Sequence, residues 1–189
     1  MKQRTLSEAL AFVVLVASCA ALRIVLRDLP NFAPVAAVAL FSGYFFRSAR
    51  VALCVPLCAM LASDWVIGGY QWQMMVLVYG MLALPVAARG FLRSRWDMAG
   101  KKSSAFAAVT ALIGCSLVAS VLFFVVTNFG CWLWFNMYEH TLAGLLNCYT
   151  QALPFFRYTL AGDLVFACVL FGGYCLSTQF AARRELARA

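Results

Sequence analysis

Long apolar runs alternate with short polar stretches along the whole chain. A helix needs about 20 mostly apolar residues to cross a bilayer. Six segments approach this pattern, so we predict an all-α, polytopic membrane helical bundle that forms a single domain over residues 1–189. The six predicted transmembrane helices are Glu8–Leu26, Asn31–Phe46, Val51–Gly68, Trp72–Ala88, Ala105–Val126 and Tyr158–Phe180.

Two parts of this pattern are irregular. The second segment is short, and Pro30 and Pro34 lie near its start, so we expect it to begin as bent or partly unwound backbone. The region Thr127–Arg157, between the fifth and sixth segments, is too polar in patches for a plain span. We predict a long outer loop there, in which Leu142–Leu146 could form a short re-entrant or interfacial helix.

The composition supports a membrane domain. The 189 residues are 65% hydrophobic and 12% charged, whereas soluble domains carry about 25% charged residues. Lys2 and Arg4 precede the first apolar run, an arrangement that is also typical of a cleaved signal peptide. Because five further apolar segments follow, we expect this run to be kept as a transmembrane helix.

Basic residues predict the orientation of the bundle. Cytoplasmic loops are enriched in Lys and Arg, and with the N-terminus inside, 12 of the 15 basic residues fall in inner loops or tails. We therefore expect a bacterial inner-membrane protein with both termini in the cytoplasm. This topology accounts for the net charge of +8, and nucleic acid is not an expected partner. The inner set is Lys2, Arg4, Arg47, Arg50, Arg89, Arg93, Arg95, Lys101, Lys102, Arg183, Arg184 and Arg188.

A second group of polar residues falls near the predicted outer face. Ionisable groups at membrane depth are costly, so they usually pair with one another or line a polar cavity. An Arg–Asp network that holds helices one, three and six together and a cluster that contacts a ligand both fit this pattern. The group contains Arg23, Arg27, Asp28, Asp64, Glu139, His140, Arg157 and Asp163.

Aromatic residues gather in the Thr127–Arg157 region, with amide side chains between them. They could form an ordinary aromatic belt at the membrane surface, or the lid of a pocket for a planar or amphipathic molecule, which needs stacking surface and a few orienting polar groups. We favour the second interpretation. The predicted substrate-binding residues are Asp64, Asn128, Trp132, Trp134, Tyr138 and Asp163, with Arg27 and Asp28 at the rim.

Residue patterns for catalysis or metal binding are weak. The chain has one histidine, His140, and no C-x-x-C motif, so we expect no metal site, no cofactor and no enzymatic activity. Cys131 and Cys148 could form an outer disulfide or ligate a metal, and their spacing does not decide between these options. The phosphate-binding pattern G-x-x-x-x-G-K-[ST] does not occur, so ATP-driven uptake would need another subunit.

Five stretches, LPNFAPVAAVALFSGYFF, PLCAMLASDWVIGGY, FFVVTNFGCWLW, YEHTLAGLLNCYTQALPFF and TLAGDLVFACVLFGGY, resemble an uncharacterised family of bacterial six-helix transport proteins. That family is similar in turn to the substrate-binding S-components of energy-coupling-factor vitamin transporters. The resemblance implies an outer pocket for a vitamin or cofactor precursor. It also implies that helix one, through small residues such as Ala17 and Ala21, docks on an energising transmembrane and ATPase module.

A protein from another functional class would also fit the sequence. A membrane scaffold or partner subunit that does not transport could use its outer polar cluster only to hold its helices together. Under this alternative, Asp163 contributes to stability and no solute binds.

Overall fold

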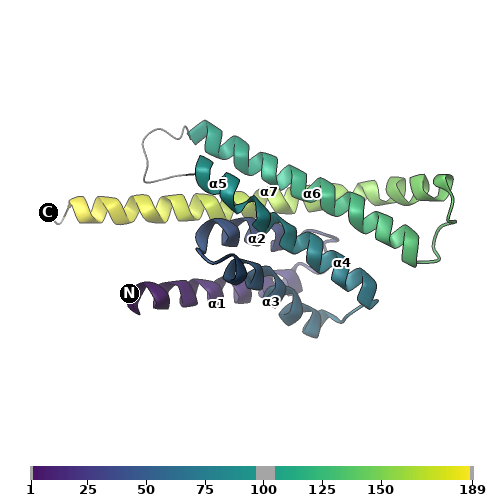
Figure 1. Cartoon of the computed structure of the whole chain (residues 1–189), viewed down its shortest axis with the longest axis horizontal. Helices are drawn as coiled ribbons and strands as arrows, with labels where there is room; N and C mark the ends of the chain where they lie inside the picture. The colour runs from purple at the N-terminus through teal and green to yellow at the C-terminus, as the bar shows by residue number, and fades with distance from the viewer. Residues whose placement is uncertain (1, 97–104, 188–189) are drawn as a thin grey trace.

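The computed structural model describes residues 2–96 and 105–187, and within these ranges the chain is helical, with no strand. The helices pack lengthwise into an elongated bundle (Figure 1). The elements are α1 (Lys2–Val25), α2 (Val35–Phe45), α3 (Ala49–Ile67), α4 (Trp72–Ala83), the 3-10 helix η1 (Leu84–Ala88), α5 (Arg89–Arg95), α6 (Ala105–Trp134) and α7 (Leu142–Leu186).

Five helical segments of the described chain are long and apolar enough to cross a membrane, in agreement with the predicted all-α bundle. The helix α2 is apolar but has only 11 residues. At 1.5 Å per residue it is about 16 Å long, roughly half the thickness of a bilayer's hydrocarbon core. The five long segments are Leu6–Val25, Ala49–Ile67, Trp72–Arg95, Ala105–Trp134 and Leu142–Arg184.

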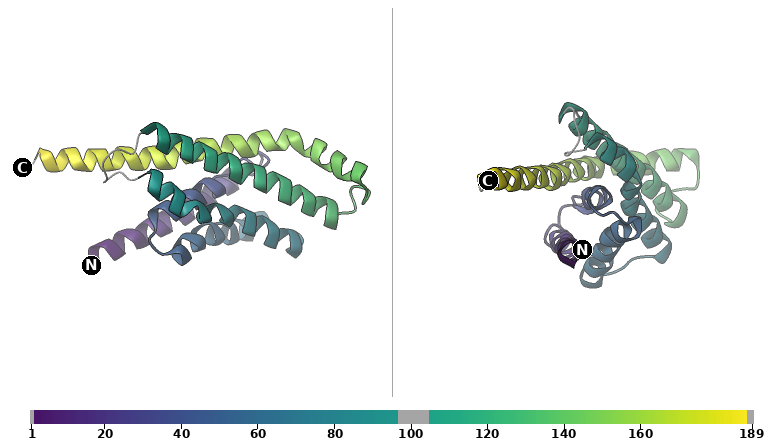
Figure 2. Two further views of the ribbon diagram at one scale, coloured as in Figure 1. Left: turned by 45° about the horizontal axis from the view of Figure 1, so that its top comes forward. Right: turned by 60° about the vertical axis from the view of Figure 1, so that its left-hand side comes forward.

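The short helix α2 occupies the centre of the bundle (Figure 2). Its residues Val35–Gly43 are all buried, and it contacts every other helical element. A helix that is apolar on all sides is stable when neighbours cover all of its faces, which fits this position. Beside it, the ring of Phe171 packs edge-on against Phe41 at 5.3 Å and against Trp96 at 5.1 Å between ring centroids.

The prediction of a long loop over Thr127–Arg157 is wrong. The helix α6 continues to Trp134, α7 begins at Leu142, and only residues 135–141 connect them. The polar residues that favoured a loop in the prediction form hydrogen bonds within their own helices. Asn128 donates to the carbonyl of Phe124 at 2.7 Å, and Thr150 donates to that of Leu146 at 2.7 Å. Such bonds let polar side chains sit within a helix. The segment Leu142–Leu146 is the start of α7 and not a separate re-entrant helix.

Both ends of the described chain lie at one end of the bundle (Figure 1). Arginines from α5 cover the last turn of α2 at this end. Arg93 Nε donates to the carbonyl of Tyr44 at 2.8 Å, and Arg89 donates to the carbonyls of Phe46 and Arg47. Cations are favourable beside the carbonyls that end a helix. Three of the predicted inner bases, Lys101, Lys102 and Arg188, lie outside the described residues.

Candidate functional site

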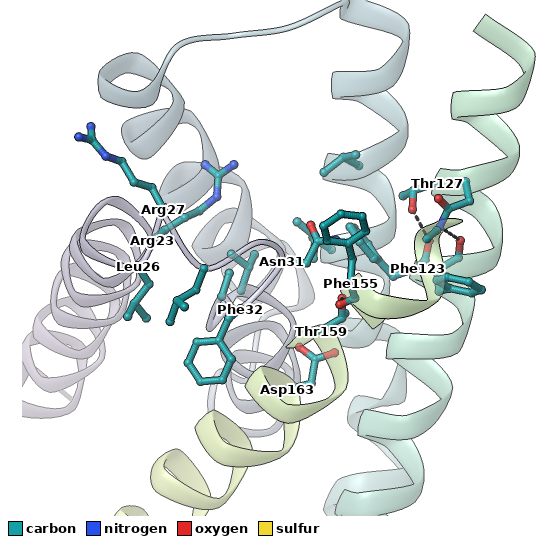
Figure 3. A pocket seen from close by; sticks show the side chains of 18 of the residues that line it. Arg23, Leu26, Arg27, Asn31, Phe32, Phe123, Thr127, Phe155, Thr159 and Asp163 are labelled. Carbon is teal, nitrogen blue, oxygen red and sulfur yellow. Dashed lines mark hydrogen bonds between the residues drawn. The ribbon is translucent and has the colours of Figure 1, made fainter. Parts of the chain in front are cut away.

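A cavity of about 410 Å³ lies toward the end of the bundle opposite the chain ends (Figure 3). Its walls come from the last turn of α1, the non-helical segment that follows, the start of α2, the end of α3, one face of α4, and the facing halves of α6 and α7. Most of the lining is apolar, and several rings contribute to it. The aromatic residues of the wall are Phe32, Tyr70, Phe123, Phe124 and Phe155.

One face of α7 forms a wall of the cavity. Ala152, Phe155, Thr159 and Asp163 all line it. Residues three or four apart lie on the same side of a helix, so this spacing places all four toward the cavity. Figure 3 shows Phe155, Thr159 and Asp163 following one another along the helix. The spacing is visible in the sequence and could have indicated the wall, but Ala152 and Phe155 fall in the segment predicted as a loop.

The opposite wall is built from the non-helical segment between α1 and α2. Leu26, Leu29, Asn31, Phe32 and Ala33 all line the cavity. The prediction that this region begins as unwound backbone is confirmed, since α2 starts only at Val35.

Two backbone features hold this wall in place. Asn31 has φ 60°, in the left-handed region that asparagine tolerates better than most residues. A Cβ atom at Gly162 of α7 would lie 3.2 Å from the backbone nitrogen of Ala33, a tight contact, so a glycine there favours the close approach of α7.

We expect Asn31→Gly to keep the stability of the protein and Asn31→Ile to lower it by about 1–2 kcal/mol, because a β-branched residue is strained at positive φ. Thermal unfolding of the purified protein, followed by circular dichroism, measures both. Equal losses in the two variants would show that the Asn31 side chain matters, and not its backbone conformation.

Asp163 is the most buried charged residue of the cavity wall, with 4% of its surface exposed. Ser120 on α6 donates a 2.6 Å hydrogen bond to its Oδ2 atom. No ion pair to Asp163 and no second hydrogen bond to its carboxylate occurs among the described residues. A carboxylate buried in this way has one neutral donor and no compensating positive charge.

Asp64 is also buried, but it is fully engaged by its neighbours. Arg23 of α1 forms an ion pair with its Oδ1 atom and also donates to Ser63, and Tyr79 of α4 donates to its Oδ2 atom at 2.6 Å. This network joins α1, α3 and α4. Arg23 lines the cavity, whereas Asp64 does not. The predicted Arg–Asp network therefore exists between the first and third helices, and Asp163 of the last helix stands apart from it.

Tyr70 adds a neutral group to the wall. It lies in the turn between α3 and α4 and lines the cavity. Partial burial raises the pKa of Tyr70 to about 12, and the nearby Asp64 carboxylate acts in the same direction. The phenol therefore keeps its proton at neutral pH and can donate a hydrogen bond.

The structure brings three of the eight predicted site residues, Arg27, Asn128 and Asp163, to the cavity wall. The others do not line it. Trp132 stabilises the connection between α6 and α7, because its Nε1 atom donates to the carbonyl of Glu139 at 2.9 Å and its ring packs against His140. Of the remaining four, Trp134 and Asp28 are exposed, Tyr138 is half-buried near that connection, and Asp64 belongs to the Arg23 network.

The cysteines are all free thiols, including Cys131, which lines the cavity, and Cys148, which donates to the carbonyl of Asn128 at 3.4 Å. Among the residues that the structure describes, no group of three His, Cys, Asp or Glu side chains is placed to hold a metal ion.

The chain belongs to a family of unknown function, DUF6580, which matches residues 3–185. No curated protein and no solved structure matches it.

Proposed function

We propose that this member of the DUF6580 family is a bacterial inner-membrane transport protein. It binds a small organic solute, such as a vitamin or cofactor precursor, in the cavity and moves it across the bilayer, in the manner of an S-component. The observation that carries this proposal is the cavity itself. Its volume of about 410 Å³ lies within the range of roughly 300–1,000 Å³ that is usual for small-molecule sites. Apolar and aromatic walls with a few polar groups are also typical of such sites.

The unwound segment before α2 supports the same interpretation. Inside a membrane, non-helical backbone is tolerated where protein covers it or where it lines a cavity. In many transporters the substrate site lies where a helix is interrupted. In the proposed topology, residues 26–34 and α2 together would make a sixth crossing, the second along the chain. Five residues of the unwound part line the cavity.

The distribution of charge supports the orientation. Arg47, Arg89 and Arg93 lie at the same end of the bundle as both chain ends, so this end faces the cytoplasm under the positive-inside rule. The cavity then opens toward the outer side. The connection between α6 and α7 extends past α3 and α4 on that side (Figure 1). Trp132 and Trp134 at the end of α6 and Tyr138 in the connection would form an aromatic belt in this orientation.

Energy for transport would come from a separate membrane and ATPase module. Ala17 and Ala21 lie on the exposed face of α1. Small residues four apart allow another helix to approach closely. We place the docking surface for that module on this face.

Equilibrium binding tests the proposal. Native mass spectrometry of the protein purified from its own host would first identify a retained small molecule and any ATPase subunit. Isothermal titration with a vitamin panel would follow. Thr159→Leu adds bulk to the cavity wall and should weaken binding by about tenfold or more. Thr150→Leu makes the same change on an exposed part of the same helix and should leave binding unchanged.

A different result would favour the alternative of a scaffold that does not transport. The network of Arg23, Asp64 and Tyr79 is the observation in favour of that role, since it joins three helices. If no retained molecule is found and no panel member binds or raises the unfolding temperature, the transport proposal is wrong.

A further inference from the structure

We propose that the solute carries a positively charged amine, which binds Asp163 at the buried side of the cavity. This inference rests on the proposed function, because it names the chemical class of the solute for the same site. Its basis is the balance of charge around the cavity.

Three lining residues are of types that ordinarily carry a charge at neutral pH: Arg23, Arg27 and Asp163. The charge of Arg23 is already matched by Asp64, with which it forms an ion pair. Arg27 lies at the exposed rim, where 60% of its side chain is open and its Nε atom is 4.0 Å from the Asp28 carboxylate. Water therefore screens it, and in Figure 3 it points away from Asp163. Asp163 is therefore the buried acid of the described cavity wall that has no oppositely charged partner.

A buried carboxylate with a single neutral donor is unfavourable unless it gains a proton or a cation. The Ser120 hydroxyl donates to only one of the two carboxylate oxygens, Oδ2. No basic side chain of the described chain pairs with Asp163, so the carboxylate is balanced either by a proton or by a cation from outside the protein. An ammonium group suits this site, because it offers several donors and a full positive charge to the free Oδ1 atom.

The neighbouring groups fit the rest of such a molecule. Thr159 lies one turn from Asp163 and Phe155 one turn further, while Phe32 lies across from them (Figure 3). Ring faces attract cations and stack on planar groups. The solute would place its amine at Asp163 and its apolar or aromatic body toward the outer opening. A molecule with only a carboxylate would meet repulsion at the buried side.

Matched pairs of probes test this inference. Pyridoxamine and pyridoxine differ by an amine in place of a hydroxyl, and so do tryptamine and tryptophol. We expect the amine of at least one pair to bind the intact protein about tenfold or more tightly than its alcohol at pH 7, because a hydrogen bond to a charged group is stronger than one between neutral groups. Asp163→Asn should remove this preference, so that the amine and its alcohol bind with affinities within about twofold of each other. Glu139→Gln, which alters an exposed acid that does not line the cavity, should keep the preference.

The wild-type comparison decides the inference even if Asp163→Asn does not fold. If alcohols bind as tightly as amines, or if only neutral and anionic members of the vitamin panel bind, the inference is overturned and the proposed function stands. A preference for amines that persists in a folded Asp163→Asn protein also overturns it. If neither the probes nor the panel bind and no molecule is retained, the inference and the proposed function fail together.

Discussion

Replacing Asp64 with alanine is expected to lower the free energy of unfolding by about 3–5 kcal/mol, because it leaves the Arg23 guanidinium partly buried without its counter-charge. Tyr79 loses its hydrogen-bond partner in the same change, because its hydroxyl donates to this carboxylate. The loss can be measured from reversible unfolding of the protein in detergent micelles, followed by circular dichroism or tryptophan fluorescence.

Two further variants separate the network from a general effect of removing an acid. The side chain of Asp28 is 92% exposed, so Asp28→Ala should change the stability by less than about 0.5 kcal/mol. The double variant Arg23→Leu/Asp64→Leu should recover much of the loss, because apolar residues of similar volume can replace a buried ion pair. If Asp64→Ala is as stable as the wild type, the network does not hold α1, α3 and α4 together.

Phe171→Ala is expected to lower the free energy of unfolding by about 3–5 kcal/mol, the usual cost of removing a fully buried phenylalanine ring. The ring is completely buried and packs against Phe41, Tyr44 and Trp96, so its loss leaves a cavity between α7 and the central helix α2. The same unfolding measurement applies. Phe180→Ala removes the same ring from an exposed position of α7 and should have little effect. Equal losses at the two positions would show that burial against α2 is not the cause.

The sequence predicted the helical class of the fold and the positions of most helices well. An apolar run long enough to cross a bilayer has to satisfy its own backbone hydrogen bonds, and a helix does so. The unwound start of the second segment was also predictable, since Pro30 and Pro34 restrict the backbone there. The error at Thr127–Arg157 has a physical cause. Hydropathy treats Asn128 and Thr150 as signs of a loop, although both donate to carbonyls of their own helix and leave its backbone intact.

The candidate site was less predictable, because it depends on contacts between distant residues. In the sequence, Asp64 and Asp163 look alike as acids within apolar segments. Only the fold brings Arg23, 41 residues away, to Asp64 and leaves Asp163 with Ser120, 43 residues away. The predicted pocket therefore included acids of two different kinds. The aromatic residues of the actual wall, such as Phe32 and Phe155, had no distinguishing pattern among the many rings of the chain.

The central position of α2 has a consequence for how the protein is made. The helix is synthesised early, but its burial depends on α3, which follows directly, and on α7, which is synthesised last. While the ribosome is still translating, the side of α2 that carries Phe41 has no Phe171 or Tyr174 to pack against. In the proposed membrane topology, a helix of about 16 Å would lie in a much thicker lipid layer, with that side uncovered, until the last helix is inserted. In that topology we expect the core to assemble only after α7 is inserted, and nascent chains that stop before α7 to be substrates for membrane quality-control proteases.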